Sequence, residues 1–295
     1  MITSFGKDYE LIDCGDFEKL ERFGRYRLRR PEPQAIWPKA LPQSEWQQAD
    51  AWFKRSSASA AADGSERGEW LLRPQMPDRW TVACPCGQHE LRFRLGMTSF
   101  KHVGLFPEQA ANWDFIYDSV KRLPATPQVL NLFAYTGGAT LAARAAGAEV
   151  THLDAVRQVV NWAHDNMELS GLDNVRWIVE DAMNYVRREA RRGKRYQGII
   201  LDPPAYGRGP KGEKWILSES IAELMAACAQ LLDPQRGFVV LNLYSMGFSP
   251  LIADNLLRVW FPYAGEVEHG ELCMRDRSGR VLPLSVYARF RHIEE

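Results

Sequence analysis

Short apolar runs alternate with amphipathic stretches from about residue 129 to the end of the chain. The apolar runs predict strands, and the stretches whose apolar residues recur at helical spacing predict helices. Strands are expected at 128–133, 149–153, 175–179, 198–201 and 238–243, helices at 138–146, 156–171, 181–192, 216–232 and 249–260, and two closing β-rich runs near 264–273 and 282–291. Strands that alternate with helices indicate βαβ units and a mostly parallel sheet.

Residues 1 to about 100 differ from the rest of the chain in composition. They are rich in Trp, Pro and Arg, and carry five of the ten tryptophans. Short segments at 69–72 and 79–83, broken by Pro and Gly, predict strands of a small β-containing module. The small-residue polar stretch 56–68 is expected to be a mobile loop. The sequence therefore predicts two domains, a small β-rich one over residues 1–100 and an α/β domain over 101–295.

Composition narrows the class of protein. The chain has 295 residues, of which 45% are hydrophobic and 25% charged, as in ordinary globular proteins; a disordered chain, a collagen and a coiled coil are excluded. Lys and Arg number 37, as do Asp and Glu, so a globally basic nucleic-acid coat is excluded but a local basic patch is not. Five cysteines suggest no disulfide framework. No apolar run approaches the ~18 residues that a membrane span needs, and a cytoplasmic protein is expected.

A glycine pair marks the first candidate site. The strand at 128–133 leads into Gly137-Gly138, and a helix follows. Glycines let the backbone turn tightly and approach a ligand closely, and the free N–H groups of a helix start bind carboxylates or phosphates. The pattern is neither the G-x-G-x-x-G dinucleotide fingerprint nor a P-loop, so a tight βα turn without a ligand is an equal alternative.

Two acidic residues follow at the ends of the next strands. Asp154 can accept hydrogen bonds from both ribose hydroxyls of a nucleoside, and a carboxylate at Glu180-Asp181 can accept from the exocyclic amine of an adenine. Either position can instead cap the helix that comes next. Because the carboxyl ends of parallel strands meet at one edge of a sheet, these acids are expected near the glycine pair.

The fourth strand ends in the most specific signal, Asp202-Pro203-Pro204 followed by Tyr206. Two prolines fix the backbone and remove two donors, and the Tyr206 ring can stack on a planar base. A merely structural Pro-Pro turn is the alternative. Its coincidence with the three earlier signals favours a ligand site.

Together these features resemble the class I S-adenosylmethionine-dependent methyltransferases over roughly residues 100–295. The turn at 131–140 resembles motif I, Asp154 the ribose-binding acid, Asp181 the adenine-side acid and 202–204 motif IV. The sequence Phe-x-Tyr-Thr-Gly-Gly at residues 133–138 is most similar to that of bacterial large-subunit rRNA methyltransferases that make 5-methylcytosine. It is also similar to that of the related domain that makes 7-methylguanine. The resemblance implies a Rossmann-like seven-stranded sheet with a reversed last strand, S-adenosyl-L-methionine as cofactor, no metal, and rRNA as the substrate.

The resemblance also implies site residues. The segment 104–109 looks like the family's lead-in that closes over the cofactor. Cofactor-binding residues are expected at Phe106, Gln109, Phe133, Ala134, Tyr135, Thr136, Gly137, Gly138, Asp154, Ala155, Asp181, Ala182 and Asp202. Catalytic residues are expected at Asp202, Pro203, Pro204 and Tyr206.

One departure bears on the chemistry. Formation of 5-methylcytosine needs a cysteine thiolate that adds to C6 of the base, and in the relatives this cysteine follows the fifth strand. Here the stretch 242–247 has no cysteine, and Cys228 and Cys273 are expected on a core helix face and a strand. A nitrogen acceptor needs no covalent intermediate, because its lone pair attacks in line and the enzyme supplies positioning. Asp202 as a strong general base is disfavoured by its reference pKa of about 3.9.

Other features have open interpretations. Six basic residues in nine at 187–195, and the arginines of 22–30 interleaved with aromatic residues, can contact phosphates or be solvated surfaces. The segment Cys84–His89 lacks a second ligand pair for zinc and is expected to be a turn between strands. His102 is a base or has no role.

We therefore expect methyl transfer to a base in rRNA without a cysteine nucleophile. A methyltransferase of proteins or small molecules, and a non-catalytic module that binds the cofactor or RNA, are the alternatives.

Overall fold

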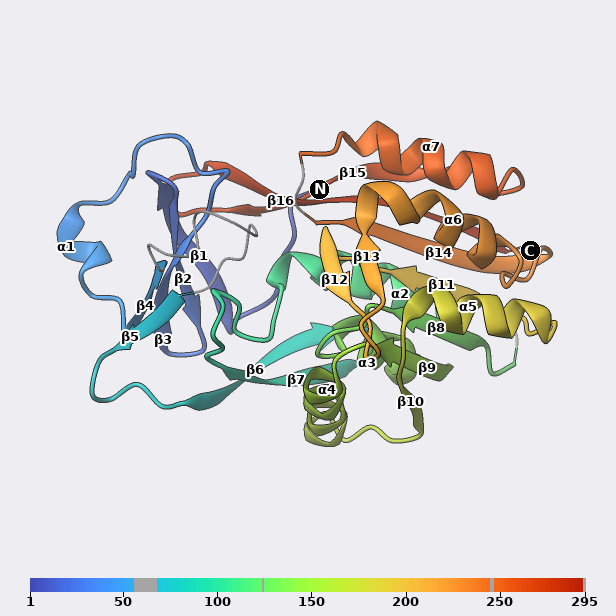
Figure 1. Cartoon of the computed structure of the whole chain (residues 1–295). Helices are drawn as coiled ribbons and strands as arrows, with labels where there is room; N and C mark the ends of the chain where they lie inside the picture. Colours follow the sequence, from blue (N-terminus) through green and yellow to red (C-terminus); the bar gives the residue numbers. More distant parts are fainter. Residues whose placement is uncertain (56–67, 124, 245–246, 294–295) are drawn as a thin grey trace.

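The computed structural model describes residues 1–55, 68–123, 125–244 and 247–293. It contains a seven-stranded sheet and, nearer the N-terminus, a separate five-stranded sheet (Figure 1). The loop expected over 56–68 lies outside the described residues except for Gly68. No described helix has the length and apolar character that crossing a membrane requires.

The apolar runs of the second region form the seven-stranded sheet. In spatial order its strands are β10 (Val175–Val179), β9 (Glu149–Asp154), β8 (Gln128–Leu132), β11 (Gly198–Leu201), β14 (Arg236–Leu243), β16 (Val281–Ile293) and β15 (Glu268–Arg275). Strands β10 to β14 of this order are parallel, whereas β16 runs antiparallel to both of its neighbours. The expected seven-stranded sheet with a reversed last strand is confirmed.

Helices cover both faces of this sheet, because its central strands are apolar on both sides. One face packs against α2 (Ala110–Arg122), α3 (Gly138–Ala145) and α4 (Arg157–Leu169). The other face packs against α5 (Ala182–Arg191), α6 (Leu217–Ala229) and α7 (Pro250–Trp260). Local signals set where helices begin: the Ser249 hydroxyl accepts a hydrogen bond from the Leu251 N–H, and Pro250 occupies the first turn of α7.

The N-terminal region builds the five-stranded sheet from short hairpins. Its strands, in spatial order, are β1 (Tyr9–Gly15), β2 (Glu18–Phe23), β3 (Tyr26–Pro31), β4 (Ala51–Arg55) and β5 (Gly68–Leu72), and the short helix α1 (Gln43–Trp46) precedes β4. Asp16 and Phe17, both with positive φ, form the turn from β1 to β2, as tight hairpins require. Residues of β3 alternate between buried and half-buried, the pattern of a strand with one covered face. The β-rich N-terminal module is confirmed.

A second hairpin, β6 (Arg79–Cys86) and β7 (His89–Gly96), contains the segment considered for zinc. Cys86 pairs with His89 across the hairpin, so the segment is a turn between strands, as expected. Among the described residues, Cys84 and Cys86 belong to no group of potential metal ligands; both thiols are buried.

The β6–β7 hairpin packs on helices of the larger sheet and also contacts the five-stranded sheet, where the Trp80 ring lies 5.7 Å from that of Tyr26. The Asn166 side chain of α4 accepts a hydrogen bond from the Arg94 N–H at 2.8 Å, and the Ser170 hydroxyl accepts one from the Arg92 N–H at 2.9 Å. One hydrophobic core runs through both parts of the chain, from Phe5 to Leu284. A domain boundary at residue 100 stays a prediction.

Candidate active site

The cleft lies where the strand order of the seven-stranded sheet reverses. In the chain β8 is followed by its neighbour β9, whereas β11 lies on the other side of β8. Ligands of such sheets bind beyond the carboxyl ends of the strands at this point. Two adjoining cavities, of about 50 and about 340 Å³, open there. Together they are lined by every residue that the sequence analysis assigned to the cofactor or to catalysis: Phe106, Gln109, Phe133, Ala134, Tyr135, Thr136, Gly137, Gly138, Asp154, Ala155, Asp181, Ala182, Asp202, Pro203, Pro204 and Tyr206.

The turn after β8 is backbone-strained. Phe133, Tyr135 and Gly137 all have positive φ, of 56°, 48° and 91°, and only glycine adopts such values without steric cost. The Gly137 N–H donates to the Ala134 carbonyl at 3.0 Å, and α3 begins at the next residue. A Cβ on Gly138 would lie 2.3 Å from Cζ2 of Trp113. The second glycine therefore lets α2 pack against the start of α3.

Asp154 is the last residue of β9, and its carboxylate binds the backbone of the glycine turn that follows the neighbouring strand β8. Its carboxylate accepts hydrogen bonds from the Tyr135 N–H at 3.0 Å and from the Val156 N–H at 2.9 Å. Burial raises the pKa of Asp154, and these backbone hydrogen bonds oppose the rise. It does not cap α4, whose N-cap residue is Val156. Each carboxylate oxygen keeps a second lone pair for another donor.

The two acids at the end of β10 both have partners in the protein. The Asp181 carboxylate accepts a hydrogen bond from the Asn184 N–H at 2.9 Å and so caps α5. Glu180 forms an ion pair with Arg188. The capping alternative therefore holds for Asp181, although its side chain also lines the larger cavity.

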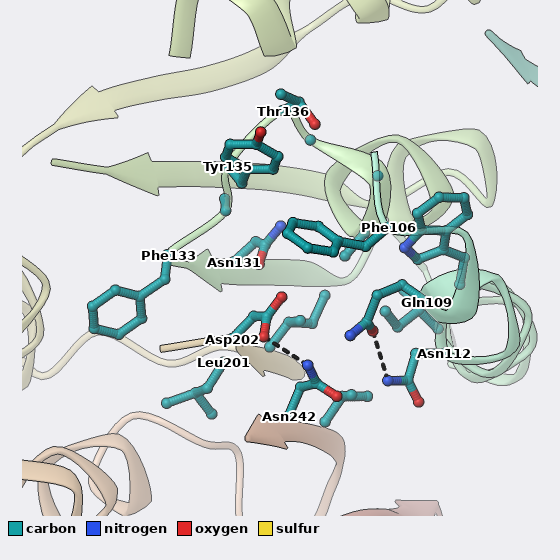
Figure 2. Close-up of a pocket in the computed structure, with 18 of the residues that line it drawn as sticks. Phe106, Gln109, Asn112, Asn131, Phe133, Tyr135, Thr136, Leu201, Asp202 and Asn242 are labelled. Carbon is teal, nitrogen blue, oxygen red and sulfur yellow. Dashed lines mark hydrogen bonds between the residues drawn. The ribbon is translucent and has the colours of Figure 1, made fainter. Parts of the chain in front are cut away.

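Asp202 lies at the carboxyl end of β11, where both cavities meet. Its carboxylate accepts a hydrogen bond from the Asn242 amide at 2.7 Å (Figure 2), and the Asn242 carbonyl in turn accepts one from the Ser285 hydroxyl at 3.3 Å. Burial raises the pKa of Asp202 to about 6, against the opposing effect of the Asn242 hydrogen bond. This environment makes the Asp202 carboxylate a stronger base than its reference pKa indicates.

The two prolines lead into a small hairpin, β12 (Tyr206–Arg208) and β13 (Lys214–Ile216). The indole N–H of Trp215 donates to the Pro204 carbonyl at 2.7 Å, and its ring lies 4.9 Å from that of Phe133. Trp215 is buried, whereas the side of the hairpin that carries Tyr206 faces outward, with Tyr206 63% exposed. The turn at Pro203-Pro204, here called the proline corner, is thus held in place by the buried Trp215, while the Tyr206 ring stays accessible from outside.

The lead-in segment covers the other side of the cleft. The Thr136 hydroxyl donates to the Gly104 carbonyl at 2.7 Å, which ties this segment to the glycine turn. A short 3-10 helix, η1 (Pro107–Gln109), then precedes α2. The Gln109 carbonyl accepts a hydrogen bond from the Asn112 amide at 2.9 Å, and its own amide group points into the cavity (Figure 2).

Aromatic rings form the outer wall of the larger cavity. The Phe106 ring centroid lies 5.2 Å from His102, 5.6 Å from Tyr135 and 5.7 Å from Tyr244. Burial, with nearby Lys101, lowers the pKa of His102 to about 3. His102 is therefore a neutral wall residue at physiological pH, and a role as a base that takes up a proton there is not favoured.

The two basic clusters lie away from this cleft or are internally paired. Residues 187–195 follow α5 to the amino end of β11, the opposite edge of the sheet (Figure 1), and Arg187, Arg188 and Arg192 pair with glutamates. In the N-terminal sheet the arginines at 22, 27, 29 and 30 also form ion pairs. The alternative of a structural surface is favoured for both clusters.

Several lining residues escaped the sequence analysis: Asn112, Asn131, Trp215, Asn242 and Tyr244. Asn131 and Asn242 are buried near the ends of apolar strands, and a polar residue in such a strand is the signal that points to them. The Asn131 amide donates to the Thr140 hydroxyl at 2.9 Å, which fixes α3 against β8. Trp215 and Tyr244 carry no such signal.

Comparison with known proteins agrees with this geometry. Residues 63–252 match the family model described as S-adenosylmethionine-dependent methyltransferase. The chain is 38% identical to a SAM-dependent methyltransferase from Agrobacterium tumefaciens, whose crystal structure matches with a TM-score of 0.89 over 99% of this chain and 92% of that one.

Curated relatives are similar over parts of the chain. A ribosomal RNA large subunit methyltransferase K/L from Shewanella frigidimarina is 29% identical over 60% of this chain and 25% of its own length. A ribosomal RNA large subunit methyltransferase I from Aeromonas salmonicida is 33% identical over 39% of this chain and 27% of its own. The chain thus spans about a quarter of the length of these relatives. With most of its length matched by the family model and a solved relative similar end to end, the chain belongs to the S-adenosylmethionine-dependent methyltransferases.

Proposed function

We propose that this methyltransferase transfers the methyl group to a nitrogen of a base in rRNA, by direct in-line attack and without a cysteine nucleophile. The observation that carries the proposal is Asp202. It combines a pKa raised to about 6 with a place beside two prolines and an exposed Tyr206 ring. The curated relatives named above act on large-subunit rRNA, which supports the choice of acceptor.

The residues at the cleft fit S-adenosylmethionine. The larger cavity, about 340 Å³, has apolar walls from Leu153 and Val156 beside the Asp154 carboxylate, a combination suited to an adenosine. The start of α3 presents N–H groups without intrahelical acceptors, which suit the amino-acid carboxylate. We assign the Asp154 carboxylate to hydrogen bonds with the ribose hydroxyls, and the backbone of residues 133–138 to the amino-acid part of the cofactor. Gln109 is assigned to a polar contact with the cofactor from the lead-in segment 104–109.

When bound, the cofactor supplies an electrophilic methyl group on a sulfonium, which an acceptor nitrogen takes with its lone pair as the S–CH3 bond breaks. The Asp202 carboxylate accepts the N–H hydrogen bond of the acceptor and then its proton. The Asn242 amide holds that carboxylate in place. The Tyr206 ring stacks on the acceptor base, and Trp215 keeps the proline corner rigid. Positioning of this kind supplies most of the acceleration in a reaction with a good nucleophile.

The cysteines favour a mechanism without a thiolate. All five are buried, and none lines either cavity of the cleft in the described part of the chain. Burial raises the pKa of every one of these thiols, to about 12 for Cys14 and Cys86. Protonated, enclosed thiols are poor nucleophiles.

The proposal is tested by transfer of a labelled methyl group to three pools: unmodified large-subunit rRNA, total protein and total small molecules. Label in rRNA, recovered after nuclease digestion as an N-methylated nucleoside, is the expected result. Label in protein or small molecules alone contradicts the choice of acceptor. Cofactor binding without transfer to any pool indicates a non-catalytic module. A carbon-methylated pyrimidine, or a covalent adduct with RNA that contains 5-fluorocytidine, contradicts the mechanism.

A further inference from the structure

The β12–β13 hairpin has two chemically different faces. Trp215 points inward to Pro204 and Phe133. Because side chains alternate along a strand, Tyr206 and Arg208 share the opposite face of β12, and Lys214 lies on that face of β13, directly across from Arg208. All three of these residues are exposed. The outward face therefore combines an aromatic ring with two cations.

The cross-strand pair Arg208 and Lys214 is unfavourable by itself, since like charges directly opposite one another destabilise a hairpin. Within the described residues neither forms an ion pair, in contrast to most cations of the two basic clusters. The acidic residue at the hairpin tip, Glu213, is engaged elsewhere: its carboxylate accepts hydrogen bonds from the Lys211 N–H at 2.9 Å and from the Asn184 amide at 3.3 Å. The positive charges of Arg208 and Lys214 are therefore available to pair with an external anion.

The position of these cations matters as much as their charge. Arg208 and Tyr206 line the same cavity as Asp202 and Pro203, so the hairpin forms the rim of the methyl-transfer cleft. A strand rises about 3.3 Å per residue, which sets the backbone positions of Tyr206 and Arg208 about 6.6 Å apart along β12. An aromatic ring beside cations is the combination by which proteins bind single-stranded nucleic acid, with the base stacked and the phosphate paired.

We propose that the outward face of the β12–β13 hairpin is the RNA-contacting surface of this enzyme, where Arg208 and Lys214 bind the phosphates that flank the target nucleotide. The inference rests on the proposed function and deepens it. It moves RNA contact from the two sequence-evident basic clusters to a hairpin face whose two exposed cations form no ion pair among the described residues. It also explains the like-charge pair, because a phosphate between Arg208 and Lys214 removes their mutual repulsion.

The test compares two matched double variants. Arg208→Gln/Lys214→Gln removes the two cations of the outward face, and Arg191→Gln/Lys194→Gln removes one Arg and one Lys at the far end of α5. Binding of a fluorescein-labelled single-stranded RNA of mixed sequence is measured from 50 to 300 mM salt. Each phosphate contact contributes about 0.7 to the slope of log K against log salt for single strands. The hairpin variant should lose about 1.4 of the wild-type slope and at least tenfold in affinity at 50 mM, and the α5 variant neither.

Two further measurements make the result decisive. Thermal unfolding of the hairpin variant should occur at a temperature no lower than that of the wild type, because the variant loses only a like-charge pair, and this shows that the variant is folded. The charge-conserving variant Arg208→Lys/Lys214→Arg should keep the wild-type slope. If the wild type binds RNA and the hairpin variant retains the full slope, or if the α5 variant loses it, the inference is wrong and the proposed function stands. If the wild type neither binds nor methylates RNA, the proposed function itself fails.

Discussion

At the scale of single residues, Asp202 shows how surroundings change the chemistry of a carboxyl group. An Asp in water is ionised above pH 4 and is a weak base. Enclosed at the end of β11, the Asp202 carboxyl has a pKa raised to about 6 by burial, and the Asn242 amide favours its ionised form. The residue is therefore tuned toward proton acceptance near neutral pH.

The pH dependence of catalysis follows from this shift. Because the proposed mechanism needs ionised Asp202, kcat/KM should rise with pH and level off above about 6, falling about tenfold per unit on the acid side. Asp202→Asn should lower kcat about 100-fold or more while cofactor affinity stays within about tenfold. Initial rates from pH 4.5 to 8.5 at saturating cofactor measure the profile. A kcat/KM that stays level down to pH 4.5 would show that no carboxyl group with a raised pKa controls the reaction, and would contradict the role given to Asp202.

Asn242 acts through Asp202 and has its own signature. Asn242→Ala removes the donor to the ionised carboxylate, so the pKa of Asp202 rises and the inflection of kcat/KM moves upward by about one pH unit, the equivalent of about 1.4 kcal/mol. Activity should recover at pH 8 and above. Ser285→Ala, which loses only the more remote hydrogen bond, is the control and should move the inflection less. Loss of activity at all pH values alike would indicate a purely structural role for Asn242.

At the scale of elements, the glycine turn and the β12–β13 hairpin, which both line the cleft, are built differently. The turn depends on positive φ values and on the absence of side chains, as at Gly137 and Gly138. The hairpin depends on one anchor, Trp215, which joins the proline corner to the core. Substitutions that add atoms should therefore damage the turn, whereas substitutions that remove atoms should damage the hairpin.

The turn can be tested by a single methyl group. In Gly138→Ala the added Cβ would lie 2.3 Å from the Trp113 ring, and overpacking of this kind costs about 1–3 kcal/mol. We expect a lower free energy of unfolding and at least tenfold weaker cofactor binding, because α3 must move. Gly96→Ala is the control, since its Cβ would meet neighbours only at 3.6 Å or more. Equal effects of the two substitutions on denaturant unfolding would remove the steric argument.

At the scale of the whole molecule, a buried ionic network joins the N-terminal sheet to the catalytic cleft. Arg30 of β3 donates two hydrogen bonds to Glu21 of β2, at 2.7 and 2.9 Å, and one to the Lys101 carbonyl at 3.1 Å. Lys101 immediately precedes His102 in the segment that leads to Phe106. The N-terminal sheet therefore supports the wall of the cleft.

Removal of one partner of this network should unfold more than the N-terminal sheet. Arg30→Met leaves the Glu21 charge buried without its bidentate partner, which costs about 3–5 kcal/mol. We expect a single calorimetric transition at a lower Tm, because one core runs through both regions, and weaker cofactor binding. Glu21→Gln/Arg30→Met should regain part of the lost stability. Two separate transitions, with the cleft intact after the first, would contradict a shared folding unit.

The order of helices and strands after residue 128 is readable from the chain because hydrophobic periodicity is local. Each apolar run or amphipathic stretch carries its own period, and the glycine pair and the Asp-Pro-Pro segment carry their own backbone constraints. The observed elements begin and end within a few residues of the predicted ones. The exception is the β12–β13 hairpin, whose three-residue strands are too short to show a period.

Tertiary structure decided the properties that depend on atoms distant in sequence. Asn242 and Ser285 reach Asp202 only because β14 and β16 lie beside β11, and the raised pKa of Asp202 is a property of that enclosure. In the same way, the folded chain determines which cations have carboxylate partners and which are left exposed at the cleft. By itself the sequence determined where a ligand site must form, because strand ends and turns are local; its chemistry was decided by desolvation and long-range pairing, which only the folded chain creates.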